Sequence, residues 1–133
     1  MASKKTYPET VDELLEMAGR SRSKHHSSMK GYEVDHVIEL QLVVKGLENT
    51  RYRRQGWATE IVDFFNSKLN LKDRPKTENR KKGYAASRLK DGSDPKPGDD
   101  KWIKEIRSKW MNIRDKLHDF LQFKGNLNKL LQC

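Results

Sequence analysis

Asp35 and His36 place a carboxylate beside an imidazole, between a short strand-like run at 32–34 and an apolar run that follows it. A histidine can take a proton from water near neutral pH, and a carboxylate can hold a divalent cation that neutralises charge developing on a phosphate. Adjacent side chains on a strand point to opposite faces, so their joint use requires the chain to turn just after His36. The dipeptide alone is a weak signal, because His36 can equally be a hydrogen-bonded structural residue.

Downstream polar residues have a spacing that gives this pair more weight. Asn70 is followed nine positions later by Asn79, and three positions further by Lys82. Asp-His on a strand, Asn-Leu on a second short strand and Asn-x-x-Lys on the next helix resemble the HNH nucleases of the ββα-metal, or His-Me finger, group. The resemblance covers residues 31–90 and is carried by Tyr32-Glu-Val-Asp-His-Val-Ile-Glu-Leu and by the stretch 70–83.

The resemblance implies a role for each matching residue. Asp35 would be the first metal ligand and His36 the general base that activates water. Asn70 would orient the histidine through backbone hydrogen bonds, and Asn79 would be the last metal ligand, on the helix. Lys82, one helical turn further, would face the phosphate.

The ligand types indicate which cofactor to expect. Carboxylate and amide oxygens suit Mg²⁺ or Mn²⁺, with Zn²⁺ also allowed. Glu39 completes an Asp-His-x-x-Glu pattern and is a candidate partner for a catalytic group.

The chain departs from the family pattern in three ways. Thirty-three residues separate His36 from Asn70, so a helical insertion must lie between the two strands. Paired cysteines are absent, because the single cysteine is Cys133. Asn66 is a rival for the place of Asn70, although its position in an apolar helical pattern favours a surface residue.

Charge favours a polyanionic partner. The chain carries 28 Lys and Arg against 19 Asp and Glu, a formal net charge of +9, and basic residues displace counterions condensed on phosphate backbones. Residues 66–90 alone hold nine Lys and Arg against two acids. We expect DNA, in preference to RNA, to bind the residues Lys76, Arg80, Lys81, Lys82 and Arg54. Such a run of charge can also be no more than a solvated face.

Helical spacing dominates the rest of the sequence. Thr10 and Glu13 predict a capped first helix. The apolar run 37–47 predicts a helix that stops near Gly46, and further helices are expected over 57–69 and 76–89. A linker at 90–100 precedes a long amphipathic helix that Asp99 and Asp100 would cap, and a short helix is expected over 124–133. Apolar positions at three- and four-residue steps in the long helix are Trp102, Ile103, Ile106, Trp110, Ile113, Leu117, Phe120 and Leu121.

The expected fold is therefore mostly helical α+β. A short two-stranded ββα-metal finger would carry an inserted helical segment and flanking helices. The chain is read as a single domain over 1–133, with an HNH-like core at about 31–90 and a helical part at about 99–131.

The leading hypothesis is a metal-dependent, HNH-like endonuclease that hydrolyses phosphodiester bonds. The alternatives are a non-catalytic nucleic-acid-binding module on the same scaffold, or a helical protein-interaction domain. No signal peptide or membrane span is visible, which favours an intracellular protein, cytoplasmic or nuclear. The sequence does not indicate an oligomeric state.

Overall fold

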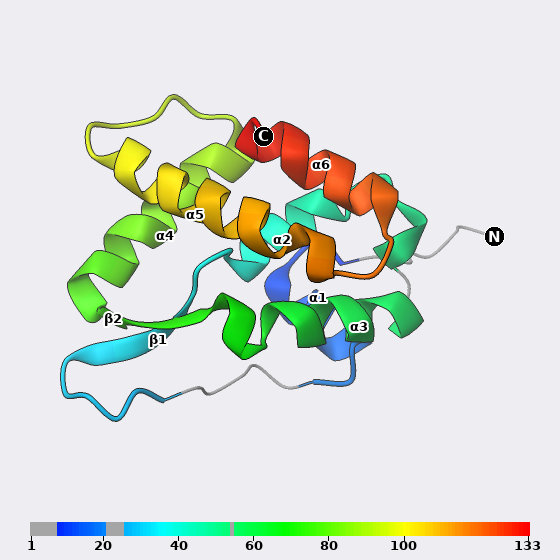
Figure 1. Cartoon of the computed structure of the whole chain (residues 1–133), viewed down its shortest axis with the longest axis horizontal. Coiled ribbons are helices and arrows are strands. Elements are labelled where there is room, and N and C mark those ends of the chain that lie inside the picture. The colour runs from blue at the N-terminus through cyan, green and yellow to red at the C-terminus, as the bar shows by residue number, and fades with distance from the viewer. Residues whose placement is uncertain (1–7, 21–25, 54) are drawn as a thin grey trace.

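The two predicted strands pair with each other. The computed structural model describes residues 8–20, 26–53 and 55–133. Strand β1 (Tyr32–His36) runs antiparallel to β2 (Leu71–Pro75), with His36 opposite Leu71 and Tyr32 opposite Pro75. Helix α4 (Lys76–Asp91) begins directly after β2. The strands therefore form a ββα unit at one edge of the molecule (Figure 1).

The insertion between the strands is helical, as predicted. It contains α2 (Leu40–Gly46), a 3₁₀ turn η1 (Arg51–Arg53), α3 (Gln55–Phe65) and a second 3₁₀ turn η2 (Lys68–Asn70). Helix α2 ends at Gly46, as expected, and the backbones of Val37 and Ile38 before it are bound to Asn70. Helix α3 ends at Phe65 rather than at Leu69.

The remaining helices close a single apolar core over the insertion. Helix α1 (Val11–Met17) contacts α3, and its first turn is capped by Thr10 Oγ1, which accepts from the backbone N–H of Glu13 at 3.1 Å. Helix α6 (Leu121–Leu131) contacts α2, and helix α5 (Asp99–Ile113) contacts α4 and α6 (Figure 1). The rings of Phe65, Trp110 and Phe123 meet in the centre, with centroids 5.9–6.2 Å apart. The mostly helical α+β class is thus confirmed.

The long C-terminal helix is the main error of the sequence prediction. Helix α5 ends at Ile113, a 3₁₀ turn η3 (Arg114–Lys116) follows, and α6 begins only at Leu121. Phe120 sits at the corner with φ of 48°, and its buried side chain packs on the ring of Tyr52. The break lets α6 fold back onto α2, where a Cβ on Gly46 would lie 2.8 Å from Phe123 Cε1. None of the helices in the described part of the chain is long and apolar enough to cross a membrane.

Asp99 joins α4 to α5, and among the described residues no side chain forms an N-cap hydrogen bond at the start of α5. Its buried carboxylate accepts from Arg88 Nε at 2.7 Å, from Arg88 Nη2 at 2.6 Å and from the backbone N–H of Lys96 at 2.9 Å. The residue at the N-cap position is Gly98, with φ of 92°. The Asp99 contacts therefore fix the linker between the two helices.

Replacing Asp99 with alanine should lower the free energy of unfolding by about 1–3 kcal/mol, because the half-buried Arg88 guanidinium and a backbone N–H lose their acceptor. Asp100→Ala is the matched control, since that side chain is 80% exposed and should change stability by no more than about 0.5 kcal/mol. Urea unfolding of both variants measures the difference. Equal midpoints for the two would contradict the role given to Asp99.

Acid should remove the stabilisation that the Asp99 carboxylate provides. The hydrogen bond from Arg88 holds the pKa of Asp99 below its ordinary value. For a lowered folded-state pKa, the stabilisation is complete above the unfolded-state value of about 3.9 and is lost as the pH falls through the folded-state value. The parent and Asp99→Ala should therefore converge in stability at strongly acid pH.

Candidate active site

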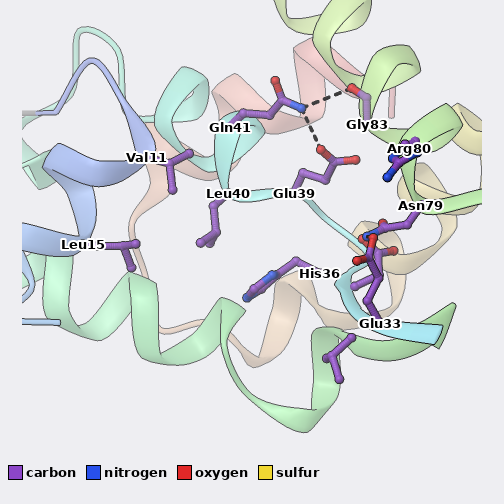
Figure 2. Close-up of a pocket in the computed structure, with 12 residues that line it drawn as sticks. Val11, Leu15, Glu33, His36, Glu39, Leu40, Gln41, Asn79, Arg80 and Gly83 are labelled. Atoms are coloured by element: carbon purple, nitrogen blue, oxygen red, sulfur yellow. Dashed lines mark hydrogen bonds between the residues drawn. The ribbon is translucent and has the colours of Figure 1, made fainter. Parts of the chain in front are cut away.

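The two sequence segments that resemble a nuclease finger line one cavity. It measures about 600 Å³ and is bounded by β1 and the loop after it, by the start of α2, by α4 and by α1. Its apolar wall is formed by Val11, Leu15 and Leu40. Its polar wall includes Glu33, Asp35, His36, Glu39, Asn79 and Arg80 (Figure 2). His36 and Asn79 are 43 residues apart in the sequence, yet they share this space.

Asn70 makes the turn that the Asp-His pair requires. Its side chain is fully buried, and Oδ1 accepts from the backbone N–H of Ile38 at 2.8 Å. Nδ2 donates to the backbone oxygens of Ile38 and Phe65, both at 3.0 Å, and the Asn70 backbone oxygen accepts from Val37 N–H at 2.8 Å. One residue therefore fastens the chain immediately after His36 to the end of α3 and the start of β2. These bonds hold the backbone that follows His36.

The His36 ring has a partner that the sequence did not reveal. Its Nε2 lies 2.5 Å from Oδ1 of Asn66, just after the end of α3. Both side chains are half-buried. The expectation that Asn66 is an ordinary surface residue is therefore wrong. The one available signal was that α3 had to end before Asn70, which leaves Asn66 near a helix terminus.

Asp35 belongs to a buried cluster of charges. Its carboxylate accepts from Arg74 Nε at 3.0 Å and from Lys82 Nζ at 3.2–3.3 Å, and all three side chains are at most 4% exposed. Lys82 also donates to Glu39 Oε2 at 3.2 Å and to the backbone oxygen of His36 at 3.0 Å. Burial raises the pKa of Asp35, and the charges of Lys82 and Arg74 offset part of that effect.

The cluster extends to α5 through Arg74. Its guanidinium forms a two-point ion pair with Glu105 and lies 5.3 Å from the ring centre of Trp102. Burial raises the pKa of Glu105, but the hydrogen bond and charge of Arg74 outweigh it and leave the pKa below its ordinary value. Arg74 and Glu105 were missed from the sequence. The signal was faint: Glu105 stands on the apolar side of α5, between Trp102 and Ile106.

Lys82 does not have the predicted role of facing a phosphate. It is 0% exposed, and its ammonium donates hydrogen bonds to Asp35, Glu39 and the His36 backbone oxygen. Glu39 was expected to partner a catalytic group. Its carboxylate accepts from Gln41 Nε2 (Figure 2) and from Lys82 Nζ, and Lys82 in turn donates to the His36 backbone oxygen.

The expected metal ligands have different neighbours. Asp35 and Asn79 line the same cavity, but Asp35 is held by two cations, whereas Asn79 Nδ2 donates to Glu33 Oε1 at 2.8 Å. Figure 2 shows Glu33 and Asn79 side by side at the polar end. Within the described ranges, no group of three or more His, Cys, Asp or Glu side chains could hold a metal. Carboxylate and amide oxygens such as those of Glu33 and Asn79 do suit Mg²⁺, which in proteins often takes one or two side-chain oxygens and keeps water or phosphate in its other positions.

The outer face of α4 is basic. Lys76, Arg80 and Lys81 are exposed there, and Arg80 also borders the cavity. Arg54, the remaining predicted nucleic-acid contact, lies outside the described residues.

Comparisons of the chain with protein-family models, curated sequences and solved structures find no match.

Proposed function

We propose that the protein is a metal-dependent endonuclease that hydrolyses phosphodiester bonds, in DNA rather than RNA, with His36 as the general base. One observation carries this proposal: His36 and Asn79, from segments far apart in the sequence, line one cavity of a ββα unit whose turn is fastened by Asn70. A base beside hard oxygen ligands is the set of groups that phosphodiester hydrolysis needs.

We propose that the Asn79 amide oxygen and the Glu33 carboxylate hold the divalent cation. Both side chains line the cavity and are within hydrogen-bond distance of each other. Asp35, the carboxylate expected from the resemblance, would have to give up Lys82 or Arg74 before it could bind a cation, because its charge is already balanced. A bound cation would neutralise charge developing on the scissile phosphate.

The basic face of α4 supports a nucleic-acid substrate. Arg80 reaches the cavity rim, and Lys76 and Lys81 continue the exposed positive surface along the same helix. Such residues position a phosphate backbone without identifying bases, so the proposal includes no sequence preference.

A metal-dependence assay tests the proposal. Supercoiled plasmid incubated with the protein and Mg²⁺ or Mn²⁺ should be nicked and then linearised, and EDTA should stop the reaction because phosphate charge is no longer neutralised. Added Mg²⁺ in excess of the chelator should restore cleavage. Plasmid that stays intact with both metals, over the pH range in which histidine loses its proton, would contradict the proposal.

The buried Asp35 cluster favours one alternative, a nucleic-acid-binding module without catalysis. In that alternative the cations Arg74 and Lys82 take the place of a metal at Asp35. Under this alternative, DNA binding should weaken with added salt but should persist in EDTA and in the His36→Ala variant. DNA should not be cleaved. The same gel assay, run beside a binding titration, separates the two functions.

A further inference from the structure

The contact between His36 and Asn66 limits where the imidazole carries its proton. A separation of 2.5 Å between Nε2 and the amide oxygen Oδ1 is a hydrogen bond. The oxygen has only lone pairs to offer, so the nitrogen must supply the hydrogen. Neutral imidazole carries one N–H, and with that hydrogen on Nε2 the unprotonated nitrogen is Nδ1.

The position of Asn66 in the fold makes it a rigid support. It follows the last residue of α3, and its backbone N–H donates to Val62 O at 2.9 Å. Four residues later Asn70 fastens the chain after His36 to the end of the same helix. The backbone that follows His36 and the His36 ring are therefore held by two asparagines of one short segment.

We propose that Asn66 is a positioning residue, which selects the Nε2–H form of His36 and fixes the ring so that Nδ1 is the nitrogen that accepts a proton from water. The inference rests on the proposed nuclease function for its catalytic part. The tautomer itself does not depend on that function.

Other polar groups also lie near His36. Glu33, Asp35, Glu39 and Arg80 border the same cavity, and Lys82 donates to the His36 backbone oxygen. Asn66 is the residue whose side chain meets Nε2. Removing the Asn66 side chain should therefore take this acceptor away from Nε2 without unpairing a buried charge.

Nitrogen-15 NMR of the histidine rings tests the tautomer directly. At a pH where the ring is neutral, His36 should show a protonated Nε2 and an unprotonated Nδ1, with the signals assigned by their loss in His36→Ala. In Asn66→Ala the chemical shifts of the two ring nitrogens should move toward the averaged values shown by the exposed His26. Asn66→Asp, which keeps an oxygen acceptor, should hold them at the parent values. An Nδ1–H form in the parent, or ring signals unchanged in Asn66→Ala, would overturn the proposal.

Kinetics supply the second readout. Asn66→Ala should lower kcat by about 10–100-fold, as for other residues that orient a catalytic group, with an unchanged KM because Asn66 is not expected to touch substrate. Asn66→Asp should recover part of kcat at a pH where the ring is neutral. An Asn66→Ala protein with the parent kcat would overturn the catalytic part.

Asn128 offers a matched control. Its Oδ1 also accepts from an aromatic ring N–H, that of Trp110 at 2.8 Å, but it lies on α6, in the C-terminal part of the chain. Asn128→Ala should leave the His36 ring signals and kcat unchanged. A parent protein that cleaves nothing yet shows the Nε2–H form would refute the proposed function alone, while a cleaving protein with the Nδ1–H form would refute only the role of Asn66.

Discussion

Cleavage by His36→Ala should be slower than cleavage by the parent by about 10²–10⁴-fold, the usual loss when a positioned general base is removed. The His36 ring is half-buried at the end of β1, and its Nε2 is hydrogen-bonded to Asn66 Oδ1. Its removal should therefore leave the core and the buried charge cluster intact. Initial rates on plasmid with Mg²⁺, and urea unfolding of the same preparations, measure activity and folding separately.

His118→Ala controls for the loss of an imidazole elsewhere. The His118 side chain is 77% exposed and lies before α6, outside the residues that line the cavity. The His118→Ala variant should cleave plasmid at the parent rate. A folded His36→Ala protein that is as active as His118→Ala would show that His36 is not the base.

Lys82→Met should lower the free energy of unfolding by about 3–5 kcal/mol, because removing one partner of a buried ion pair leaves the others uncompensated. Methionine keeps much of the side-chain volume while losing the ammonium. Asp35 would keep Arg74, but Glu39 would lose its ionic partner and the His36 backbone oxygen would lose its donor. Urea unfolding at neutral pH gives the value.

Lys81→Met is the matched control for Lys82, one position earlier on α4. Lys81 is exposed, and its loss should change stability by no more than about 0.5 kcal/mol. The pair also tests the phosphate-facing role that the sequence predicted for Lys82. Weakened DNA binding in Lys82→Met with an unchanged unfolding midpoint would support that role and contradict the buried one.

Local signals predicted the separate pieces of the ββα unit, and the resemblance to the HNH finger implied that they belong together. Pro75 correctly marked the start of α4, and the spacing from Asn70 to Asn79 placed one residue at the turn and the other on the helix facing β1. The role of Asn70 was predictable because its hydrogen bonds hold segments next to the two strands. The insertion followed from the length of chain between His36 and Asn70.

The buried cluster could not be predicted, because the partners of a charged side chain depend on tertiary contacts. In the sequence, Lys82 and Arg74 cannot be told apart from the exposed basic residues around them. Glu105, a partner of Arg74, lies on a helix far along the chain. The break in the C-terminal helix had a related cause. The apolar spacing continues through Ile113, Leu117 and Phe120 although the backbone turns there, since all three side chains still enter the core.

Locating the metal tests the central claim most directly. Crystals grown with Mn²⁺ and measured for anomalous scattering should show one ion in the cavity, with Asn79 Oδ1 and a Glu33 carboxylate oxygen about 2.0–2.6 Å away. An ion bound by Asp35 and Asn79, with Lys82 displaced, would return the ligand pair to the one expected from the resemblance. A protein that cleaves DNA with Mn²⁺ bound elsewhere, and none in the cavity beside His36, would contradict the proposed active site.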